Sequence, residues 1–363
     1  MYLHIAEKEF KINDLRNGNF QMYGEEHIDN VLIFCFEWLN GKEEFTMQSS
    51  GSTGNPKTIV IKRNQMEASA KATAKVLGLK ENDNSLICIN TEYIGGRMML
   101  VRALEFNLNT WIISPSSHPL SKVPTTITFD FIAMVPLQVQ SSIENELSQL
   151  QKVKKIIIGG APISNFLKEQ IILVLKATAV YMTYGMTETV SHIALKKICE
   201  NSDNLYHTID GVSINVDERN CLNIIAPMSD YQKVQTNDVV KLISTTSFEW
   251  LGRVDNIINS GGVKIQAEKI ESNAIKILSD MGYSSVSIFV GGIPHSLLGE
   301  QAILFIEGIS LTTDDQNTLL QNLSKKVGKF EVPKQIISIG SFIKTDTMKI
   351  KRKETINNYL ASQ

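Results

Sequence analysis

Short apolar segments alternate with longer segments of helical periodicity over the first 250 residues. The segments 85–90, 110–114 and 155–158 are rich in β-branched residues, which favours strands. Because strands that alternate with helices build parallel sheets covered by helices, the pattern predicts an α/β domain.

A helix is expected directly after a glycine-rich loop. Asn64 followed by Glu67 is typical of a capping box, and the alanine-rich stretch after it keeps helical spacing as far as Leu77, just before Gly78. The loop at 49–57 would therefore open onto this helix.

The pattern changes near residues 251–260, where a short polar connector appears. Strand signals at 285–290 and 302–306 and a helix signal at 315–327 follow it. We therefore predict a large N-terminal domain, 1–253, with mostly parallel sheets covered by helices, and a small mobile α+β domain, 254–363. Neither an internal repeat nor a low-complexity tract interrupts this scheme.

Composition narrows the function classes. The 363 residues are 43% hydrophobic, and 36 Lys and Arg stand against 38 Asp and Glu, so there is no positive excess to bind nucleic acid or an anionic membrane. The scattered cysteines suggest neither a zinc site nor disulfides, and no run is long enough to span a membrane. We expect a cytoplasmic protein that acts on small molecules, and the sequence predicts no oligomeric state.

The first candidate site is the loop at 49–57, in which glycines and hydroxyls precede a lysine. Glycines let backbone amides approach an anion, hydroxyls donate hydrogen bonds to phosphate oxygens, and the lysine adds charge. The loop is not of the GxxxxGK[ST] type, because a proline precedes the lysine and no hydroxyl follows it. We predict that ATP phosphates bind to Ser49, Ser50, Gly51, Ser52, Thr53, Gly54 and Lys57.

The second candidate site is the segment from Tyr181 to Thr189, which follows a strand-like stretch at 177–181. A tyrosine can stack on a purine, Thr187 can bond a phosphate oxygen, and Glu188 can bind Mg²⁺ that bridges phosphates. A second glycine turn, at Gly160, Ala161 and Pro162, precedes it. Both turns follow strands, where open α/β sheets bind ligands.

Three further segments are candidate site residues, but each one alone is weak evidence for a function. Asp238 could accept hydrogen bonds from ribose hydroxyls, although an aspartate in such a position is more often a turn residue. The glycines around Asp255 and at Gly261 and Gly262 suit a domain linker or a close ligand approach. Lys349 lies in a basic stretch that is usually a solvated face.

Taken in order, these segments resemble the adenylate-forming superfamily of acyl-CoA synthetases, luciferases and peptide-synthetase adenylation domains, from Ser49 to about residue 353. The resemblance implies that Lys349, Thr187 and Glu188 are catalytic and that Glu188 holds the metal. It also implies a hinge at Asp255 and a coenzyme A tunnel at Gly261 and Gly262. Adenine and ribose would bind at Gly160, Ala161, Pro162, Tyr184, Gly185, Met186, Asp238 and Arg253.

Within the superfamily, the short chain and the segment from Tyr184 to Ser191 look like the o-succinylbenzoate CoA ligases of menaquinone biosynthesis. The stretch from Tyr93 to Arg102 is similar to their acyl pocket, whose final arginine faces the substrate's second carboxylate. The resemblance therefore implies acyl-substrate contacts at Tyr93, Arg97 and Arg102. A helix-surface position remains the alternative for Arg102, and Asn237 departs from the glycine usual in the ribose motif.

The implied activity is adenylation of a carboxylic acid by ATP and Mg²⁺, followed by thioester formation with coenzyme A. The alternatives are another aryl- or acyl-CoA ligase, an enzyme that loads a carrier protein, and, more remotely, an inactive adenylate-binding regulator. The acidic and basic candidates together argue against the inactive form.

Overall fold

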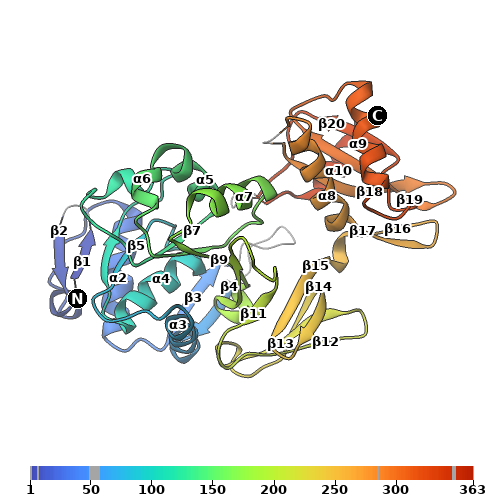
Figure 1. Cartoon of the computed structure of the whole chain (residues 1–363). Coiled ribbons are helices and arrows are strands. Elements are labelled where there is room, and N and C mark those ends of the chain that lie inside the picture. Colours follow the sequence, from blue (N-terminus) through green and yellow to red (C-terminus); the bar gives the residue numbers. More distant parts are fainter. Residues whose placement is uncertain (1, 6–7, 49–57, 284–285, 346–348, 363) are drawn as a thin grey trace.

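The computed structural model describes residues 2–5, 8–48, 58–283, 286–345 and 349–362. It contains a large sheet of thirteen strands, a sheet of five strands near the C-terminus and a two-stranded hairpin (Figure 1). None of the helices in these described ranges has the length and apolar character that a membrane crossing requires.

The first half of the large sheet is mainly parallel. Its order runs β9-β8-β7-β5-β6-β1, with β2 antiparallel at the edge. This is the α/β arrangement that the alternating pattern predicted. The strands are β1 (Tyr2–Ile5), β2 (Lys8–Lys11), β5 (Asn84–Ile87), β6 (Asn109–Ile112), β7 (Phe131–Met134), β8 (Lys155–Ile158) and β9 (Ala179–Gly185).

Strands β7 and β8 are buried on both faces of the sheet, which explains their runs of consecutive apolar residues. Along β8, Ile157 faces a core formed with α2, α3 and α4, whereas Ile156 and Ile158 face a core formed with α5, α6 and α7. The helices of the large domain are α1 (Ile12–Arg16), α2 (Glu26–Leu39), α3 (Arg63–Leu77), α4 (Ile94–Glu105), α5 (Pro136–Asn145), α6 (Leu147–Leu150) and α7 (Asn165–Val174), with 3₁₀ turns η1 (Leu120–Lys122), η2 (Thr187–Thr189) and η3 (Pro227–Ser229).

The second half of the sheet is antiparallel, which the alternating pattern did not indicate. After β9, most strands pair with the strand before or after them in the sequence. Such antiparallel pairs can be joined by short connections and need no crossover helix. The strands are β10 (His192–Ile198), β11 (Tyr206–Thr208), β12 (Ser213–Val216), β13 (Cys221–Ile225), β14 (Val234–Ser244) and β15 (Ser247–Arg253).

The predicted helix α3 is present, but its N-terminal contact differs from the expected capping box. The helix begins at Arg63, and the Gln65 side chain accepts a hydrogen bond from the Lys62 N–H at 2.9 Å. Glu67 instead forms an ion pair with Arg63 at 2.7 Å. Gly78 ends the helix in the left-handed conformation, as its position predicted.

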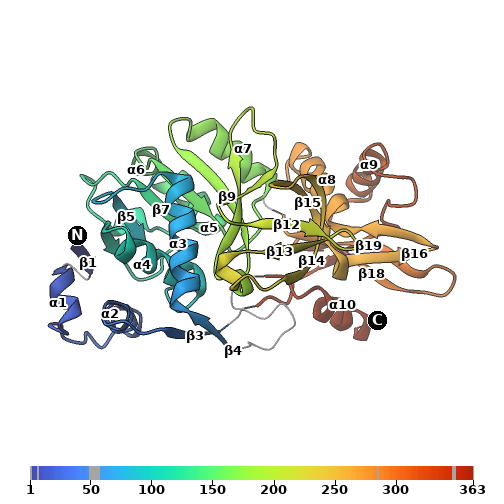
Figure 2. The same cartoon turned by 90° about the horizontal axis from the view of Figure 1, so that it is seen from below.

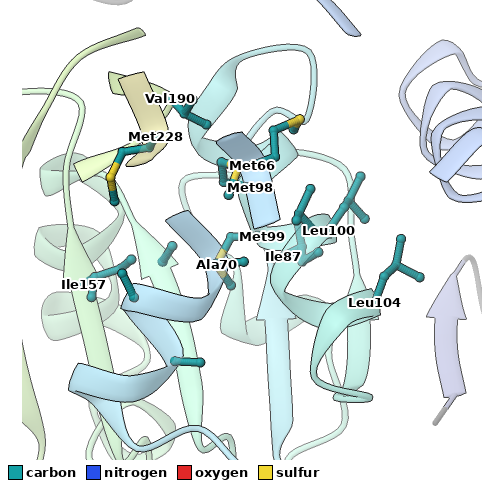
Figure 3. Packing of buried hydrophobic residues seen from close by; sticks show 14 of the residues in the cluster. Met66, Ala70, Ile87, Met98, Met99, Leu100, Leu104, Ile157, Val190 and Met228 are labelled. Carbon is teal, nitrogen blue, oxygen red and sulfur yellow. The ribbon is translucent and has the colours of Figure 1, made fainter. Parts of the chain in front are cut away.

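Helices α3 and α4 pack together over the parallel strands (Figure 3). Met66 and Ala70 of α3 lie near Met98 and Met99 of α4, and all four side chains are buried. Val190, from the turn after β9, lies at one end of the same cluster. This core therefore reaches the β9–β10 turn.

The small domain has its own sheet and its own cores. The sheet contains β16 (Ile257–Ser260), β17 (Val263–Gln266), β18 (Ile288–His295), β19 (Gly299–Glu307) and β20 (Gln335–Ile339), and its helices are α8 (Ala267–Asp280), α9 (Thr313–Ser324) and α10 (Arg352–Ala361). Its buried apolar residues form clusters separate from those of the large domain. The 3₁₀ turn η4 (Val254–Asn256) joins the domains, and β15 of the large domain contacts α8 and β17 of the small domain.

Candidate active site

The glycine turn after β8 lies beside the end of β9. A Cβ at Gly159 would approach Thr183 Oγ1 to 2.5 Å, and Gly160 has a φ of +86°, so both positions favour glycine. Gly160, Ala161 and Pro162 are exposed. The predicted adenine-binding turn therefore offers accessible backbone at the carboxyl edge of the parallel strands.

Tyr184 and Asp238 are in direct contact. The Tyr184 hydroxyl donates to Asp238 Oδ2 at 2.8 Å, and Trp250 Nε1 donates to Oδ1 at 3.1 Å. Asp238 is only 6% exposed, and Arg253 Nη1 lies 3.7 Å from Oδ1. Burial and the negative Asp238 raise the pKa of Tyr184 well above its usual value.

Aromatic rings hold Tyr184 in place. Its ring lies edge-on to Phe248 at 5.2 Å between centroids and tilted against Tyr206 at 5.6 Å. Trp250, Phe248 and Tyr206 were not among the predicted site residues. Their contacts cross strands that are distant in sequence, so only the sheet order could have indicated them.

The turn from β9 to β10 contains Gly185, Met186, Thr187 and Glu188. A Cβ at Gly185 would approach the carbonyl oxygen of Ser191, so this strand pair needs glycine there. Met186 and Thr187 are half-buried, and Glu188 is exposed. The turn thus presents one free carboxylate and one hydroxyl to a ligand.

A γ-turn closes this segment at Val190. Val190 has φ 62° and ψ −51°, and the Ser191 N–H donates to the Thr189 carbonyl at 2.6 Å. A positive φ at a β-branched residue is strained, and such strain persists where packing fixes it. Here the Val190 side chain is 1% exposed in the α3–α4 core, which fixes the direction of Ser191.

The predicted hinge residue makes two side-chain contacts. Arg253 Nη2 lies 2.8 Å from Asp255 Oδ2, and Asn237 Nδ2 donates to Asp255 Oδ1 at 3.2 Å. Asn237, which departs from the family's glycine, therefore contacts the domain connector. Gly252, with a φ of +146°, passes so close to Gln266 and Glu268 that a side chain would collide with them.

Lys349 lies near these groups. Its ammonium has a lowered pKa, first because neighbouring atoms partly desolvate it and second because the positive Arg253 is close. The Thr345 N–H donates to the Lys349 carbonyl at 2.8 Å, and Lys344 pairs with Glu307 at 2.7 Å. The small domain therefore places Lys349 close enough to Arg253 for their charges to interact.

Gly261 and Gly262 lie away from this site. Ile257 pairs with Gln266, which contacts the connector at Gly252, so the turn between β16 and β17 is at the opposite end of the hairpin. Both figures of the whole chain show this hairpin extending away from the large domain (Figure 1, Figure 2). Gly261 has φ 57° and Gly262 has φ 81°, with open space around a Cβ at Gly262.

The predicted phosphate loop, with Ser49, Ser50, Gly51, Ser52, Thr53, Gly54 and Lys57, lies outside the described residues. The strands on either side of it, β3 (Glu44–Gln48) and β4 (Thr58–Lys62), pair antiparallel. Lys62 pairs with Asp230 at 2.7 Å, which ties this hairpin to the large domain.

Arg102 is buried inside α4 rather than on its surface. It is 1% exposed, its Nη2 donates to Ser191 Oγ at 3.0 Å, and its Nε has no acceptor in the described part of the chain. No described carboxylate pairs with it. Burial alone lowers the pKa of Arg102 well below the ordinary value of a guanidinium, to about 9.

The other predicted acyl-site residues lie earlier on the same helix. Tyr93 precedes α4 and is 39% exposed. Arg97 donates from Nε to the Thr91 carbonyl at 2.8 Å, and its guanidinium lies 4.5 Å from the Phe34 ring centre. Arg97 is thus engaged within the protein, whereas Arg102 keeps an unused donor.

Comparison with known proteins agrees with this arrangement. The family model for AMP-binding enzymes matches residues 45–218. A solved acyl-CoA synthetase (AMP-forming)/AMP-acid ligase II-like protein from Dyadobacter fermentans is 37% identical, with 94% of this chain and 97% of that one covered and a TM-score of 0.63. The chain belongs to the AMP-binding enzyme family, and it is an adenylate-forming ligase.

Two further relatives carry a substrate in their names. The 2-succinylbenzoate–CoA ligase of Oceanobacillus iheyensis is 26% identical over 96% of this chain and 77% of its own. The o-succinylbenzoate CoA synthetase of Bacillus subtilis, solved with its acyl-adenylate intermediate, is 20% identical, with a TM-score of 0.70 over 85% of this chain and 68% of its own. At this identity the structural likeness shows the fold, so the predicted adenylate-forming fold is confirmed.

Proposed function

We propose that this enzyme adenylates o-succinylbenzoate with ATP and transfers the acyl group to coenzyme A. The assignment of the substrate rests on Arg102, a buried cation that has no carboxylate partner among the described residues. A buried charge is costly unless an opposite charge pairs with it. The missing charge is the second carboxylate of the substrate.

A dianionic acid fits this site better than a fatty acid. Arginine binds carboxylates through parallel N–H donors, and Arg102 Nε has no acceptor among the residues that the structure describes. An aliphatic chain would leave the same donor without an acceptor. The names of the relatives agree with this proposal.

The first half-reaction uses charges that surround the phosphates. The reacting carboxylate attacks the α-phosphorus of ATP, and pyrophosphate leaves. Lys349 and the loop at 49–57, with Lys57, would offset the charge that builds on the phosphate oxygens, and Thr187 would donate a hydrogen bond to one of them. Asp238 would bind the ribose, next to the Tyr184 ring and the turn at Gly160.

Glu188 would hold Mg²⁺ together with phosphate oxygens. The described residues contain no cluster of three or more His, Cys, Asp or Glu that could hold a metal. One exposed carboxylate plus substrate phosphates is a usual set of ligands for this ion. When bound, the metal neutralises phosphate charge.

The second half-reaction would need a different arrangement of the domains. We propose that the small domain, 254–363, turns about Asp255 so that Lys349 leaves the site and the turn at Gly261 and Gly262 enters it. The coenzyme A thiol then attacks the acyl adenylate, and AMP leaves. The separate cores of the two domains support movement as rigid units.

Pyrophosphate release across a panel of carboxylic acids tests the proposal. The panel contains o-succinylbenzoate, 4-oxo-4-phenylbutanoate (which lacks the aromatic carboxylate), benzoate and octanoate. We expect o-succinylbenzoate to give the highest kcat/KM. A preference for benzoate or octanoate would refute the substrate but not the ligase activity.

A further inference from the structure

A single chain of hydrogen bonds runs from Arg102 into the core. Arg102 Nη2 lies 3.0 Å from Ser191 Oγ, Ser191 Oγ lies 3.3 Å from His192 Nδ1, and His192 Nε2 lies 3.2 Å from Thr73 Oγ1. Thr73 Oγ1 then donates to the Ser69 carbonyl at 2.9 Å. This series of hydrogen bonds joins α4, β10 and α3.

The two ends of this hydrogen-bond series fix the direction of every bond except that between Ser191 and His192. Arg102 can only donate, so Ser191 Oγ accepts from it. The Thr73 hydroxyl donates its only hydrogen to the Ser69 carbonyl, so its oxygen accepts a hydrogen bond from His192 Nε2. His192 therefore carries a proton on Nε2. A neutral ring then has no proton on Nδ1, which accepts a hydrogen bond from the Ser191 hydroxyl.

The surroundings agree with a neutral imidazole. His192 is 5% exposed, and Thr73 is fully buried. Burial, followed by the positive charge of Arg102, lowers the pKa of His192 well below 6.5. The ring can thus act as a fixed relay between two hydroxyl groups.

We propose that His192 and Thr73 are positioning residues that hold Ser191 and Arg102 in the geometry that recognises a second carboxylate. The inference rests on the proposed function, in which Arg102 pairs with that carboxylate. Neither residue would touch the substrate. Both would act through the Ser191 hydroxyl and the guanidinium.

Loss of the Thr73 hydroxyl would make His192 and Arg102 compete for the same acceptor, Ser191 Oγ. Without the Thr73 hydroxyl, the proton on His192 Nε2 loses its acceptor, and the other tautomer becomes favourable. Nδ1–H and Arg102 would then both donate to Ser191 Oγ, and the serine hydrogen would turn elsewhere. Arg102 would lose its fixed partner, and the substrate carboxylate would meet a less ordered guanidinium.

The test compares Thr73→Val, Thr73→Ser and the control Thr178→Val. Thr178 is also a buried threonine, but its hydroxyl donates to the Val153 carbonyl outside this chain of bonds. The measured quantity is the ratio of kcat/KM for o-succinylbenzoate to kcat/KM for 4-oxo-4-phenylbutanoate. We expect Thr73→Val to lower this ratio roughly three- to tenfold, the effect of one buried hydrogen bond. Thr73→Ser and Thr178→Val should keep the wild-type ratio.

A spectroscopic measurement separates positioning from general damage. Histidine ¹⁵N spectra should show His192 protonated on Nε2 in wild type and Thr73→Ser, and a shift toward Nδ1 protonation in Thr73→Val. If Thr73→Val does not fold, Thr73→Ala removes the same hydroxyl without adding a methyl group.

The outcomes distinguish the two proposals. An unchanged ratio in Thr73→Val, together with a ratio that collapses in Arg102→Ala, overturns the relay and leaves the proposed function standing. An equal fall in Thr73→Val and Thr73→Ser also overturns it, because the serine keeps the hydroxyl. A wild-type enzyme that does not prefer the diacid overturns both.

Discussion

Replacing Arg102 by methionine should stabilise the free protein while impairing the reaction. Burial lowers the pKa of Arg102 well below its ordinary value, to about 9. Because one pH unit corresponds to about 1.4 kcal/mol, keeping this charge in the core costs roughly 5 kcal/mol at neutral pH. The hydrogen bond to Ser191 returns about 1.5 to 3 kcal/mol.

The net gain expected for Arg102→Met is therefore about 2 to 3.5 kcal/mol. Methionine keeps much of the aliphatic volume, so it leaves little cavity. Urea unfolding at pH 7.5 measures the gain, with Arg97→Met as the matched control. Arg97 is half-buried and donates to a backbone carbonyl, so its loss should not stabilise the protein.

The stabilisation expected for Arg102→Met should depend on pH. A cation whose pKa is depressed in the folded state destabilises that state fully below the folded pKa, here about 9. The penalty fades as the pH rises from about 9 toward 12.5. The advantage of Arg102→Met should thus be largest at pH 7 to 8 and shrink by about 2 kcal/mol by pH 10.5.

The same variant should lose about ten- to a hundredfold in kcat/KM for o-succinylbenzoate, while the Kd for ATP stays nearly constant. A variant less stable than wild type at pH 7.5 would refute the reasoning, since it would mean that a counter-charge already neutralises Arg102 in the free protein. Such a result would also remove the main support for a dianionic substrate.

Three other variants test other parts of the site. Lys349→Ala should slow ATP–pyrophosphate exchange by at least about a hundredfold, because one preorganised cation is lost, and should slow thioester formation from synthetic acyl adenylate much less. Gly262→Leu should leave that exchange nearly intact and block transfer to coenzyme A, because a side chain would enter the thiol path. Asp238→Asn should weaken ATP binding about tenfold by calorimetry, because the ribose loses a charged acceptor.

Each of these results can fail in an informative way. Equal losses in both half-reactions of a folded Lys349→Ala enzyme would count against two domain arrangements. Collapse of exchange in Gly262→Leu would assign that glycine to folding, since its φ of +81° also disfavours leucine. Unchanged ATP affinity in Asp238→Asn would mean that the carboxylate serves only Tyr184 and Trp250.

The sequence predicted the parallel half of the fold because its signal is local. Residues 156–158 of β8 are three consecutive buried isoleucines, as expected for a strand buried on both faces. The antiparallel half carries weaker signals, since β11 has only three residues and β12 alternates buried and exposed positions. Its strand order depends on contacts far apart in sequence, such as Tyr206 beside Phe248.

The candidate site also contains residues that local sequence motifs predict and residues that only long-range contacts bring together. Tyr184, Asp238 and Arg253 could be predicted from motifs, and the structure brings their side chains together. Thr73 and His192 carry no motif, and only the packing of α3 against β10 makes them neighbours. Arg102 was predicted as a substrate contact, but its burial without a counter-ion could not be seen from helical spacing.

Gly185 has a consequence for how new specificities can arise. Its backbone touches Ser191 and His192, so the segment that would bind the nucleotide and the segment next to Arg102 form one tight turn. A mutation that reshapes one end of this turn must also displace the other. Selection for a different acid would therefore act more readily on α4, where Tyr93 is exposed, than on the turn itself. A scaffold with this turn would therefore diversify in the acid that it binds while it keeps the same nucleotide.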